Sequence, residues 1–514
     1  MNHKNNNRSS FSGKIGFVLS AAGASVGLGN IWRFPYLAAK YGGGIFLLIY
    51  IILALTFGYT MIVAETSLGR MTGKSPVGAF HTFGKSKWLS FGGWINAIIP
   101  ILIVPYYSVI GGWVIKYLVE YAKGHGHDLA ADGYFSTFIS NGVSTELCFI
   151  VFTLCTLGII YAGVRNGIER VSRIMMPILV VLSVVITVYS VTRPGALSGV
   201  KYFLIPNPAN FSWMTVVAAM GQMFYSLSIA MGILITFGSY MKKDVSIEGS
   251  TKNVEIFDTA IAIMAGLMII PAVFAFSGGD PDTLQAGPSL MFITLPKVFD
   301  SMGTFVGIMF FVLVLFAAVT SSIALTESAV STFEDELGWG RKKSTVIMGV
   351  IMLALGTLSS LGYGPLGAVK IIGMQFLDFF DFLTNSVMMP IAAITSYPQL
   401  VLTFYLHSKT KLHIYESHRS HNYMVQYPRS YAPQPIMIIL IVFINRYRIS
   451  FYPRKFVLKL IVVVIYFFFF IRDIIYTKNK FIPLIFIYAA GMCFNKFIHF
   501  IINFSVRQNI TVLL

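Results

Sequence analysis

Long apolar stretches, separated by short polar segments, run through most of the chain. They fall roughly at residues 15–36, 43–64, 95–119, 146–162, 174–191, 213–237, 257–276, 303–330, 345–361 and 371–398. An α-helix needs about 20 mostly apolar residues to cross a bilayer, so the pattern predicts about ten membrane-spanning helices. We therefore expect an all-α, polytopic membrane protein.

The amino-acid composition agrees with this pattern. Of the 514 residues, 56% are hydrophobic and 11% are charged, whereas soluble domains carry about 25% charged residues. The first apolar stretch is too long and too rich in glycine for a cleaved signal peptide. The three cysteines show no metal-ligand spacing and indicate no disulfide framework.

Lysine and arginine gather in alternate loops, ahead of the first apolar stretch and after the second, fourth, sixth and eighth. Basic loops stay on the cytoplasmic side of a membrane. We therefore expect a multi-pass protein of the cell membrane with a cytoplasmic N-terminus. Two loops on the opposite side are long, at residues 122–144 and 277–300. The second is interpreted as an external lid, with a plain connector as the alternative.

The chain changes composition after about residue 399. Of its 45 glycines, 44 precede this point, and from residue 406 onward 14 Lys and Arg residues stand against two acidic ones. We expect a cytoplasmic segment at 1–14, a membrane core at 15–398 and an atypical basic tail at 399–514, rich in Phe, Ile, Tyr and Lys. The tail resembles an out-of-frame translation of an A/T-rich gene, a hypothesis that sequencing the 3′ end would test. Its basic residues form no separable soluble surface, so we expect no nucleic-acid partner.

The first apolar stretch contains a segment that a helix facing only lipid would not use. The sequence GASVGLGNIWR at residues 23–33 holds three glycines, an asparagine and an arginine. Such glycines let a helix unwind, and unwound backbone at mid-membrane exposes carbonyls and amides that bind a cation and a carboxylate. The sequence GQMFYSLSIAMG at residues 221–232 interrupts the sixth stretch in the same way. Two interruptions five spans apart favour a transporter with an inverted repeat.

These segments resemble the neurotransmitter:sodium symporter family of the LeuT type. The resemblance rests on GASVGLGNIWRFPYLAAKYGGGIFLLIY, FYSLSIAMG, AGPSLMFITLP, AAVTSSIA and FEDEL. It extends from about Arg8 to about Pro390 and leaves out the tail. It implies a LeuT-like five-plus-five inverted repeat with broken first and sixth helices. It also implies sodium-coupled import of an amino acid by alternating access.

The resemblance further implies two sodium sites made of oxygen atoms, the ligands that a hard cation prefers. The first site would take ligands from the first, sixth and seventh spans: Ser25, Asn30, Ser226 and Asp258. The second would combine first-span carbonyls with eighth-span groups: Gly23, Val26, Ala317, Thr320 and Ser321. The last three share one helix face by their spacing. Taken alone, the run Thr320-Ser321-Ser322 would be explained better by close packing of small residues between helices, but the first-span context favours a sodium site.

Asp258 is the most specific single candidate for a functional residue. A carboxylate inside an apolar span is costly and usually functional. The alternative is a position at the water boundary, because the polar sequence STKNVE lies just upstream. Members of the family with a neutral residue at this position recruit chloride to balance sodium. The resemblance therefore implies that this chain does not require chloride.

The resemblance also places the substrate beside the first break. Monoamine carriers of the family have an aspartate where this chain has Gly27, so we expect a substrate with its own carboxylate. That carboxylate would meet sodium, the amides of Leu28 and Gly29, and the Tyr107 hydroxyl, although Tyr107 alternatively fits an aromatic core position. The remaining pocket residues would be Ser25, Ile103, Tyr225, Ser226, Ser228, Ala230, Met231 and Leu325. This apolar lining predicts an apolar amino acid, and the Ala230 methyl favours mid-sized aliphatic side chains over tryptophan.

Two charge pairs are expected to act as gates. On the outer side Arg33 would pair with Asp381, for which Asp378 is the competing choice. On the inner side Arg8 would pair with Asp335 beside Tyr240. The alternative for Arg8 and Asp335 is ordinary solvated charge.

Two other function classes compete with symport. One is a substrate-gated channel or transport-dead receptor on the same scaffold, and the other is an intramembrane enzyme. The sequence contains no P-loop, HExxH motif or nucleophile elbow, so we expect no enzymatic activity and no organic cofactor. The histidines in GHGHD at residues 124–128 are interpreted as part of a solvated loop. The oligomeric state is left open.

Overall fold

The computed structural model describes residues 9–84, 87–278, 288–393 and 395. Arg8 and the expected tail at 399–514 lie outside these residues. The described part is built of helices and contains no named strand, only two isolated bridges, Gly43 with Pro206 and Ile371 with Met374. The expectation of an all-α architecture is therefore confirmed.

Seven helices of the described part are long and apolar enough to cross a membrane. The first is continuous through α3 (Gly44–Leu53), η2 (Ala54–Gly58) and α4 (Tyr59–Thr72). Another joins η3 (Val164–Glu169) to α10 (Arg170–Val191). The other five are α6 (Lys87–Ala122), α9 (Gly142–Tyr161), α14 (Ile247–Ser277), α16 (Thr304–Leu337) and α17 (Arg341–Leu361).

The first expected span is broken. Helix α1 (Lys14–Ser25) stops at Val26, whose backbone is extended, and the chain resumes as η1 (Gly29–Arg33) and α2 (Phe34–Lys40). The two halves meet at 54°. The Asn30 side-chain oxygen accepts a hydrogen bond from the Gly27 N–H at 3.1 Å. A side chain thus satisfies a backbone group that the break sets free.

The sixth expected span is broken as well, between α12 (Trp213–Ser226) and α13 (Ile233–Ser239). Ser228, Ala230 and Gly232 between them have φ of 53°, 60° and 70°. A right-handed helix cannot continue through left-handed residues, and only glycine adopts that conformation without strain. The break is therefore held in place by its surroundings.

Short helices connect these spans. The expected tenth span, 371–398, begins later, with α18 (Phe376–Asp381) and η7 (Phe382–Met388). The segments between the spans contain α5 (Pro76–His81), α7 (Gly126–Ala130), α8 (Tyr134–Ser140), α11 (Ala196–Leu204), η4 (Pro208–Asn210), η6 (Leu290–Thr294) and α15 (Leu295–Met302).

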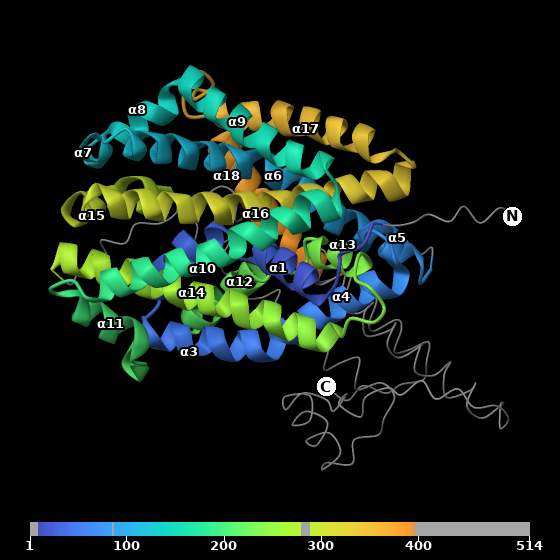
Figure 1. The fold of residues 1–514 in the computed structure, drawn as a ribbon, viewed down its shortest axis with the longest axis horizontal. Coiled ribbons are helices and arrows are strands. Elements are labelled where there is room, and N and C mark those ends of the chain that lie inside the picture. Colours follow the sequence, from blue (N-terminus) through green and yellow to red (C-terminus); the bar gives the residue numbers. More distant parts are fainter. Residues whose placement is uncertain (1–8, 85–86, 279–287, 394, 396–514) are drawn as a thin grey trace, which may run out of the picture. The chain divides into compact units, whose positions relative to one another are not determined.

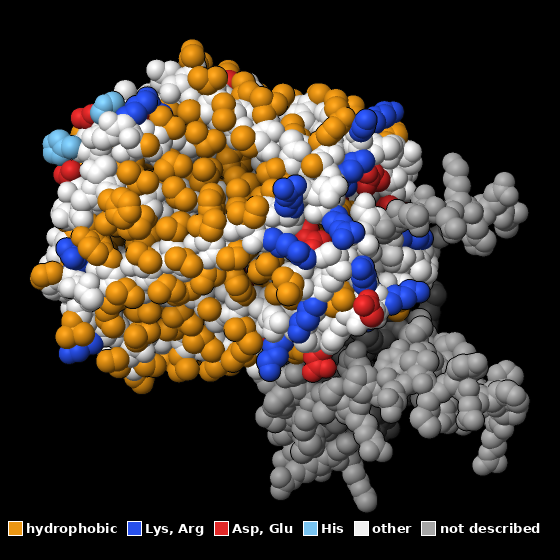
Figure 2. All heavy atoms as spheres, viewed as in Figure 1, with side chains coloured by type: hydrophobic (Ala, Val, Ile, Leu, Met, Phe, Trp, Pro, Cys, Tyr) orange, Lys and Arg blue, Asp and Glu red, His pale blue; other side chains and the backbone are white. Residues whose placement is uncertain are grey.

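The broken helices lie among the long ones. Helix α1 packs against α10, α14 and α16, and Figure 1 shows these long helices running side by side around it. In Figure 2 hydrophobic side chains cover most of the visible face, while Lys and Arg gather at the end that carries α5 and α13 in Figure 1. An apolar belt with a basic end is what the alternation of apolar and basic segments predicts for a membrane protein.

Candidate functional site

The two helix breaks meet at a buried group of polar side chains. The Asn30 Nδ2 atom donates to the Ser226 hydroxyl at 2.9 Å and to Asp258 Oδ1 at 2.8 Å. The Ser226 hydroxyl donates to Asp258 Oδ2 at 2.8 Å, and Tyr50 donates to the same oxygen at 3.4 Å. Asn30, Ser226 and Asp258 are each no more than 1% exposed. Asp258 therefore lies inside the protein and not at a water boundary.

Ser25, the fourth expected member of this group, ends α1 beside it. Its hydroxyl donates to the Ala21 carbonyl at 3.2 Å, within its own helix. The neighbouring Ala24 carbonyl accepts from Ser228 at 3.2 Å, so the first break is tied directly to the second. Gln222 adds another tie by donating to the Gly29 carbonyl at 3.1 Å.

A second group of oxygens lies where α1 meets α16. The Ser321 Oγ atom is 3.2 Å from each of the Gly23, Ala24 and Val26 carbonyl oxygens. Thr320 Oγ1 lies 3.2 Å from the Ala317 carbonyl oxygen. A Cβ atom on Gly23 would lie 3.0 Å from Thr320 Cβ, so glycine permits this close approach. The five residues expected to form the second sodium site are therefore brought together.

A cavity of about 30 Å³ lies beside both breaks. Nine of the expected substrate residues line it: Ser25, Leu28, Gly29, Ile103, Tyr107, Tyr225, Ser228, Met231 and Leu325. The sequence analysis did not assign five further lining residues to the substrate pocket: Ala24, Gly27, Asn30, Ile233 and Ser321. The Tyr107 hydroxyl accepts from the Leu28 N–H at 3.3 Å, which places a hydroxyl against the unwound backbone.

Two expected pocket residues do not line the cavity. Ser226 binds Asp258 instead. Ala230 is fully buried, and its N–H donates to Glu65 Oε1 at 2.8 Å. Since Ala230 does not line the cavity, the structure gives no support to the expected effect of its methyl group on the size of the substrate side chain. The sequence analysis missed Glu65. Its position directly after the apolar stretch 43–64 was a usable signal, because a carboxylate next to an apolar span is usually functional.

The expected outer gate residues do not form an ion pair among the described residues. The Arg33 guanidinium lies over the Tyr225 ring, 5.0 Å from its centre. Asp381 accepts from Tyr106 at 3.3 Å and from Asn385 Nδ2 at 2.6 Å. Asp378, the competing choice, accepts from Tyr363 at 2.9 Å.

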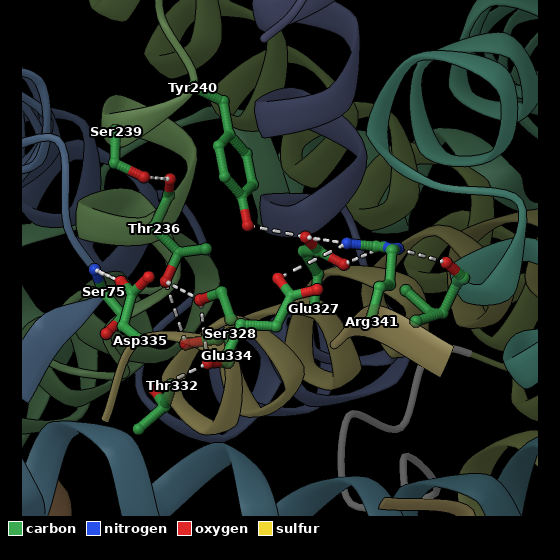
Figure 3. Close-up of polar contacts among 12 residues, drawn as sticks. Ser75, Thr236, Ser239, Tyr240, Glu327, Ser328, Thr332, Glu334, Asp335 and Arg341 are labelled. Atoms are coloured by element: carbon green, nitrogen blue, oxygen red, sulfur yellow. Dashed lines mark hydrogen bonds and ion pairs between the residues drawn. The ribbon is translucent and has the colours of Figure 1, made fainter. Parts of the chain in front are cut away.

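Of the expected inner gate, only Asp335 and Tyr240 fall within the described residues. Asp335 Oδ2 accepts from the Ser75 N–H at 2.6 Å. Tyr240 donates to Glu327 Oε1 at 2.7 Å, and Glu327 also binds Arg341 through both carboxylate oxygens, at 3.1 and 2.6 Å (Figure 3). Glu327 is fully buried. The sequence analysis missed this ion pair, although Glu327 stands out in the apolar sequence around it.

The chain is similar to known transporters over most of its length. The model of the sodium:neurotransmitter symporter family matches residues 8–125 and 136–495, continuing past residue 398, where we expected the membrane core to end. The sodium-dependent transporter YhdH of Bacillus subtilis is 37% identical over 74% of this chain and 85% of its own length. A sodium-dependent transporter of Haemophilus influenzae is 32% identical over 77% of this chain and 89% of its own.

A more distant relative is the sodium- and chloride-dependent taurine transporter of Rattus norvegicus, 28% identical over 64% of this chain and 60% of its own. Among solved structures, that of MhsT in complex with L-phenylalanine matches with a TM-score of 0.69 and 38% identity, covering 76% of this chain and 89% of that one. The match confirms the expected LeuT-like fold, and the family consists of transporters, not enzymes. The chain therefore belongs to the sodium:neurotransmitter symporter family of sodium-coupled, multi-pass membrane transporters.

Proposed function

We propose that this symporter imports an apolar amino acid together with sodium by alternating access. The observation that carries the proposal is the cavity between the two helix breaks, where unwound backbone, a buried carboxylate and apolar side chains meet. Unwound helices at mid-membrane supply the amides and carbonyls that hold a small zwitterion and its coupling ion.

The substrate carboxylate is assigned to the first break. Tyr107 and the amides around Leu28 and Gly29 lie along one side of the cavity, while Ile103, Met231 and Leu325 supply apolar surface. A Cβ atom on Gly27 would lie 2.7 Å from Ser321 Oγ and 3.1 Å from the Tyr107 hydroxyl, so the glycine leaves these two hydroxyls beside the backbone, where a substrate carboxylate would meet them. The MhsT structure contains L-phenylalanine, which is consistent with an apolar amino acid.

Two sodium ions are proposed. The first would bind among Asn30, Ser226, Asp258 and the Ser25 carbonyl, where the Asp258 charge supports a cation. The Asn30 side chain turns its NH2 group toward Asp258 in this structure, so its amide would rotate to offer oxygen to the ion. The second would bind among the carbonyls of Gly23, Val26 and Ala317 and the hydroxyls of Thr320 and Ser321.

Chloride is proposed to be unnecessary. Asp258 supplies a fixed negative charge and is 0% exposed, so it can balance sodium where no water reaches. The names of the relatives support this proposal. The two bacterial relatives, which are more similar to this chain, are named for sodium alone, whereas the rat transporter is named for sodium and chloride.

The protein is proposed to lie in the cell membrane with its N-terminus in the cytoplasm. The support is the alternation of basic loops along the sequence and the basic end seen in Figure 2. Arg33 with Asp381, and Arg8 with Asp335 beside Tyr240, are proposed to pair when the outer and inner sides close.

Uptake into proteoliposomes containing the full chain tests these proposals. A panel of labelled amino acids is offered with an inward sodium gradient, with potassium in place of sodium, and with gluconate in place of chloride. We expect accumulation of apolar amino acids that requires sodium and persists in gluconate. Binding without accumulation would contradict amino-acid symport, and collapse of uptake in gluconate would contradict chloride independence.

A further inference from the structure

The buried carboxylate of Glu169 lies outside the site described above. Glu169 is the last residue of η3, the π-helical turn ahead of α10, and is 2% exposed. A carboxylate removed from water needs several donors to offset its lost hydration. Its donors include Ser12, which lies 157 positions earlier, just ahead of α1.

Three residues form a closed group of hydrogen bonds around this carboxylate. The Ser12 N–H donates to Glu169 Oε2 at 2.8 Å, and the Ser12 hydroxyl donates to Oε1. Arg173 Nη2 lies 2.6 Å from Glu169 Oε1 and donates to the Ser12 hydroxyl at 2.5 Å. We name Ser12, Glu169 and Arg173 the inner clamp. The Glu169 side chain is 3% exposed, so its hydrogen bonds to Ser12 are shielded from water, whereas the Arg173 side chain is 48% exposed and water weakens its part of the clamp.

The clamp fastens Ser12, just ahead of α1, to Glu169, just ahead of α10. A Cβ atom on Gly16, in the first turn of α1, would overlap the Glu169 carboxylate, so α1 lies against that group. The segment just ahead of α1 also forms hydrogen bonds with residues that follow α13. The Phe11 N–H donates to the Tyr240 carbonyl at 3.1 Å, and Lys242 Nζ donates to the Ser12 carbonyl at 2.9 Å.

The same face of α1 reaches the second group of oxygens. Gly16 and Gly23 are seven residues apart, about two helical turns, and therefore lie on one face. At Gly23 a Cβ atom would lie 3.2 Å from Met176 Sδ of α10 and 3.0 Å from Thr320 Cβ of α16. Helix α10 thus follows α1 from the clamp to the carbonyls that contact Ser321. A helix moves as a stiff element, so holding its first turn limits movement at its last.

We propose that Glu169 is a positioning residue of the transport cycle: through the inner clamp it holds the cytoplasmic end of α1 against α10 and closes the route from the cytoplasm to the Gly23 and Val26 carbonyls. The inference rests on the proposed function and its orientation in the membrane. Release of the clamp lets the cytoplasmic ends of α1 and α10 part.

Accessibility of a reporter cysteine tests the clamp. Ser20 lies in α1 between Gly16 and Gly23 and is 2% exposed, so Ser20→Cys reports opening between α1 and its neighbours. The background replaces the natural cysteines (Cys148→Ala, Cys155→Ala and Cys493→Ala). A membrane-impermeant maleimide is applied from the cytoplasmic side of vesicles, in sodium.

Glu169→Gln and Ser12→Ala are expected to raise the labelling rate about tenfold. The first removes the buried charge that Ser12 and Arg173 bind, and the second removes the hydroxyl that donates to it, so each weakens the closed form. Arg165→Gln is the matched control, since Arg165 is an exposed cation of the same turn outside the clamp. Its labelling rate is expected to stay at the starting value. Adding Ser12→Ala to Glu169→Gln should give less than the product of the two effects.

Equal labelling of the Glu169→Gln, Ser12→Ala and control proteins, at unchanged melting temperature, would overturn the clamp. If Glu169→Gln does not fold, Ser12→Ala decides alone, because it removes a single hydroxyl. Labelling does not require uptake, so the two proposals fail separately. Loss of sodium-driven accumulation by the unsubstituted protein would overturn the proposed function, whereas unchanged labelling beside normal uptake would overturn only the clamp.

Discussion

Asp258 places a carboxyl group where a charge is normally unfavourable. It is fully buried and receives hydrogen bonds from Asn30, Ser226 and Tyr50. A buried charge of this kind gains most from a cation placed beside it, because electrostatic attraction is strong where water is excluded. At the scale of the residue, this charge is the feature on which the proposed ion coupling depends.

Asp258→Asn keeps the shape of the side chain and removes its charge. We expect the apparent sodium affinity for uptake to fall by at least about tenfold, equivalent to about 1.4 kcal/mol, and uptake to become stimulated by chloride. Glu255→Gln is the control, since Glu255 is another buried carboxylate on α14, one turn away. Unchanged sodium dependence in Asp258→Asn would contradict the role given to this charge.

Tyr107→Phe tests the carboxylate end of the cavity. The substitution keeps the ring but removes the hydroxyl that meets the Leu28 N–H. We expect the apparent amino-acid affinity to fall about tenfold, since hydrogen bonds to charged groups contribute about 1.5–3 kcal/mol. Tyr117→Phe is matched in chemistry, but its hydroxyl donates to the Phe292 carbonyl outside the cavity lining, so its affinity should not change.

At the scale of the element, side chains satisfy backbone groups that the helix breaks set free, from within the same span at the first break and from another helix at the second. Asn30 caps the first break, and Glu65 of α4 accepts from the Ala230 N–H in the second. Backbone groups without partners are costly inside a membrane, which explains why polar residues stand in otherwise apolar spans. The C-terminal part of α16 also holds a buried polar group through another helix, with the ion pair of Glu327 and Arg341.

Arg341→Gln tests how strongly that ion pair holds α16 to the start of α17. Removing the cation leaves the Glu327 carboxylate buried without its partner, so we expect a loss of about 3–5 kcal/mol in the free energy of unfolding. The double variant with Glu327→Gln should lose less than the sum of the single variants, because no buried charge remains. Additive losses, or an equal loss in the neighbouring Lys342→Gln, would contradict the interpretation.

At the scale of the whole molecule, the proposed substrate and sodium share one enclosed site, so each should strengthen the binding of the other. Ligands that bind only the folded protein raise its melting temperature. We expect sodium and an apolar amino acid together to raise it more than the sum of their separate effects. A ligand at 100 times its Kd contributes about 2.7 kcal/mol. Additive shifts would indicate independent sites.

Much of this architecture was predictable from the sequence because it is encoded locally. Apolar stretches long enough to cross a bilayer set the spans, and the glycines at residues 23–29 set the first break. The side-chain contacts were less predictable. Ser226 and Asp258 were expected together at the first sodium site and do contact each other, but Ser226 does not line the cavity as was also expected. Glu65 and the Glu327–Arg341 pair were not anticipated. Arg8 and the tail at 399–514 lie outside the described residues, so those expectations stay as predictions.

The sequence by itself determined the all-α membrane architecture, the two interrupted helices and the residue types able to hold a cation. Hydrophobicity and glycine act on the chain within a few turns, so they can be recognised without knowing its neighbours. Only the tertiary structure decided which polar groups face one another, such as Ala230 with Glu65 across 165 positions and Ser12 with Glu169 across 157. The physical reason is that a buried polar group must take its partner from whichever helix packs beside it.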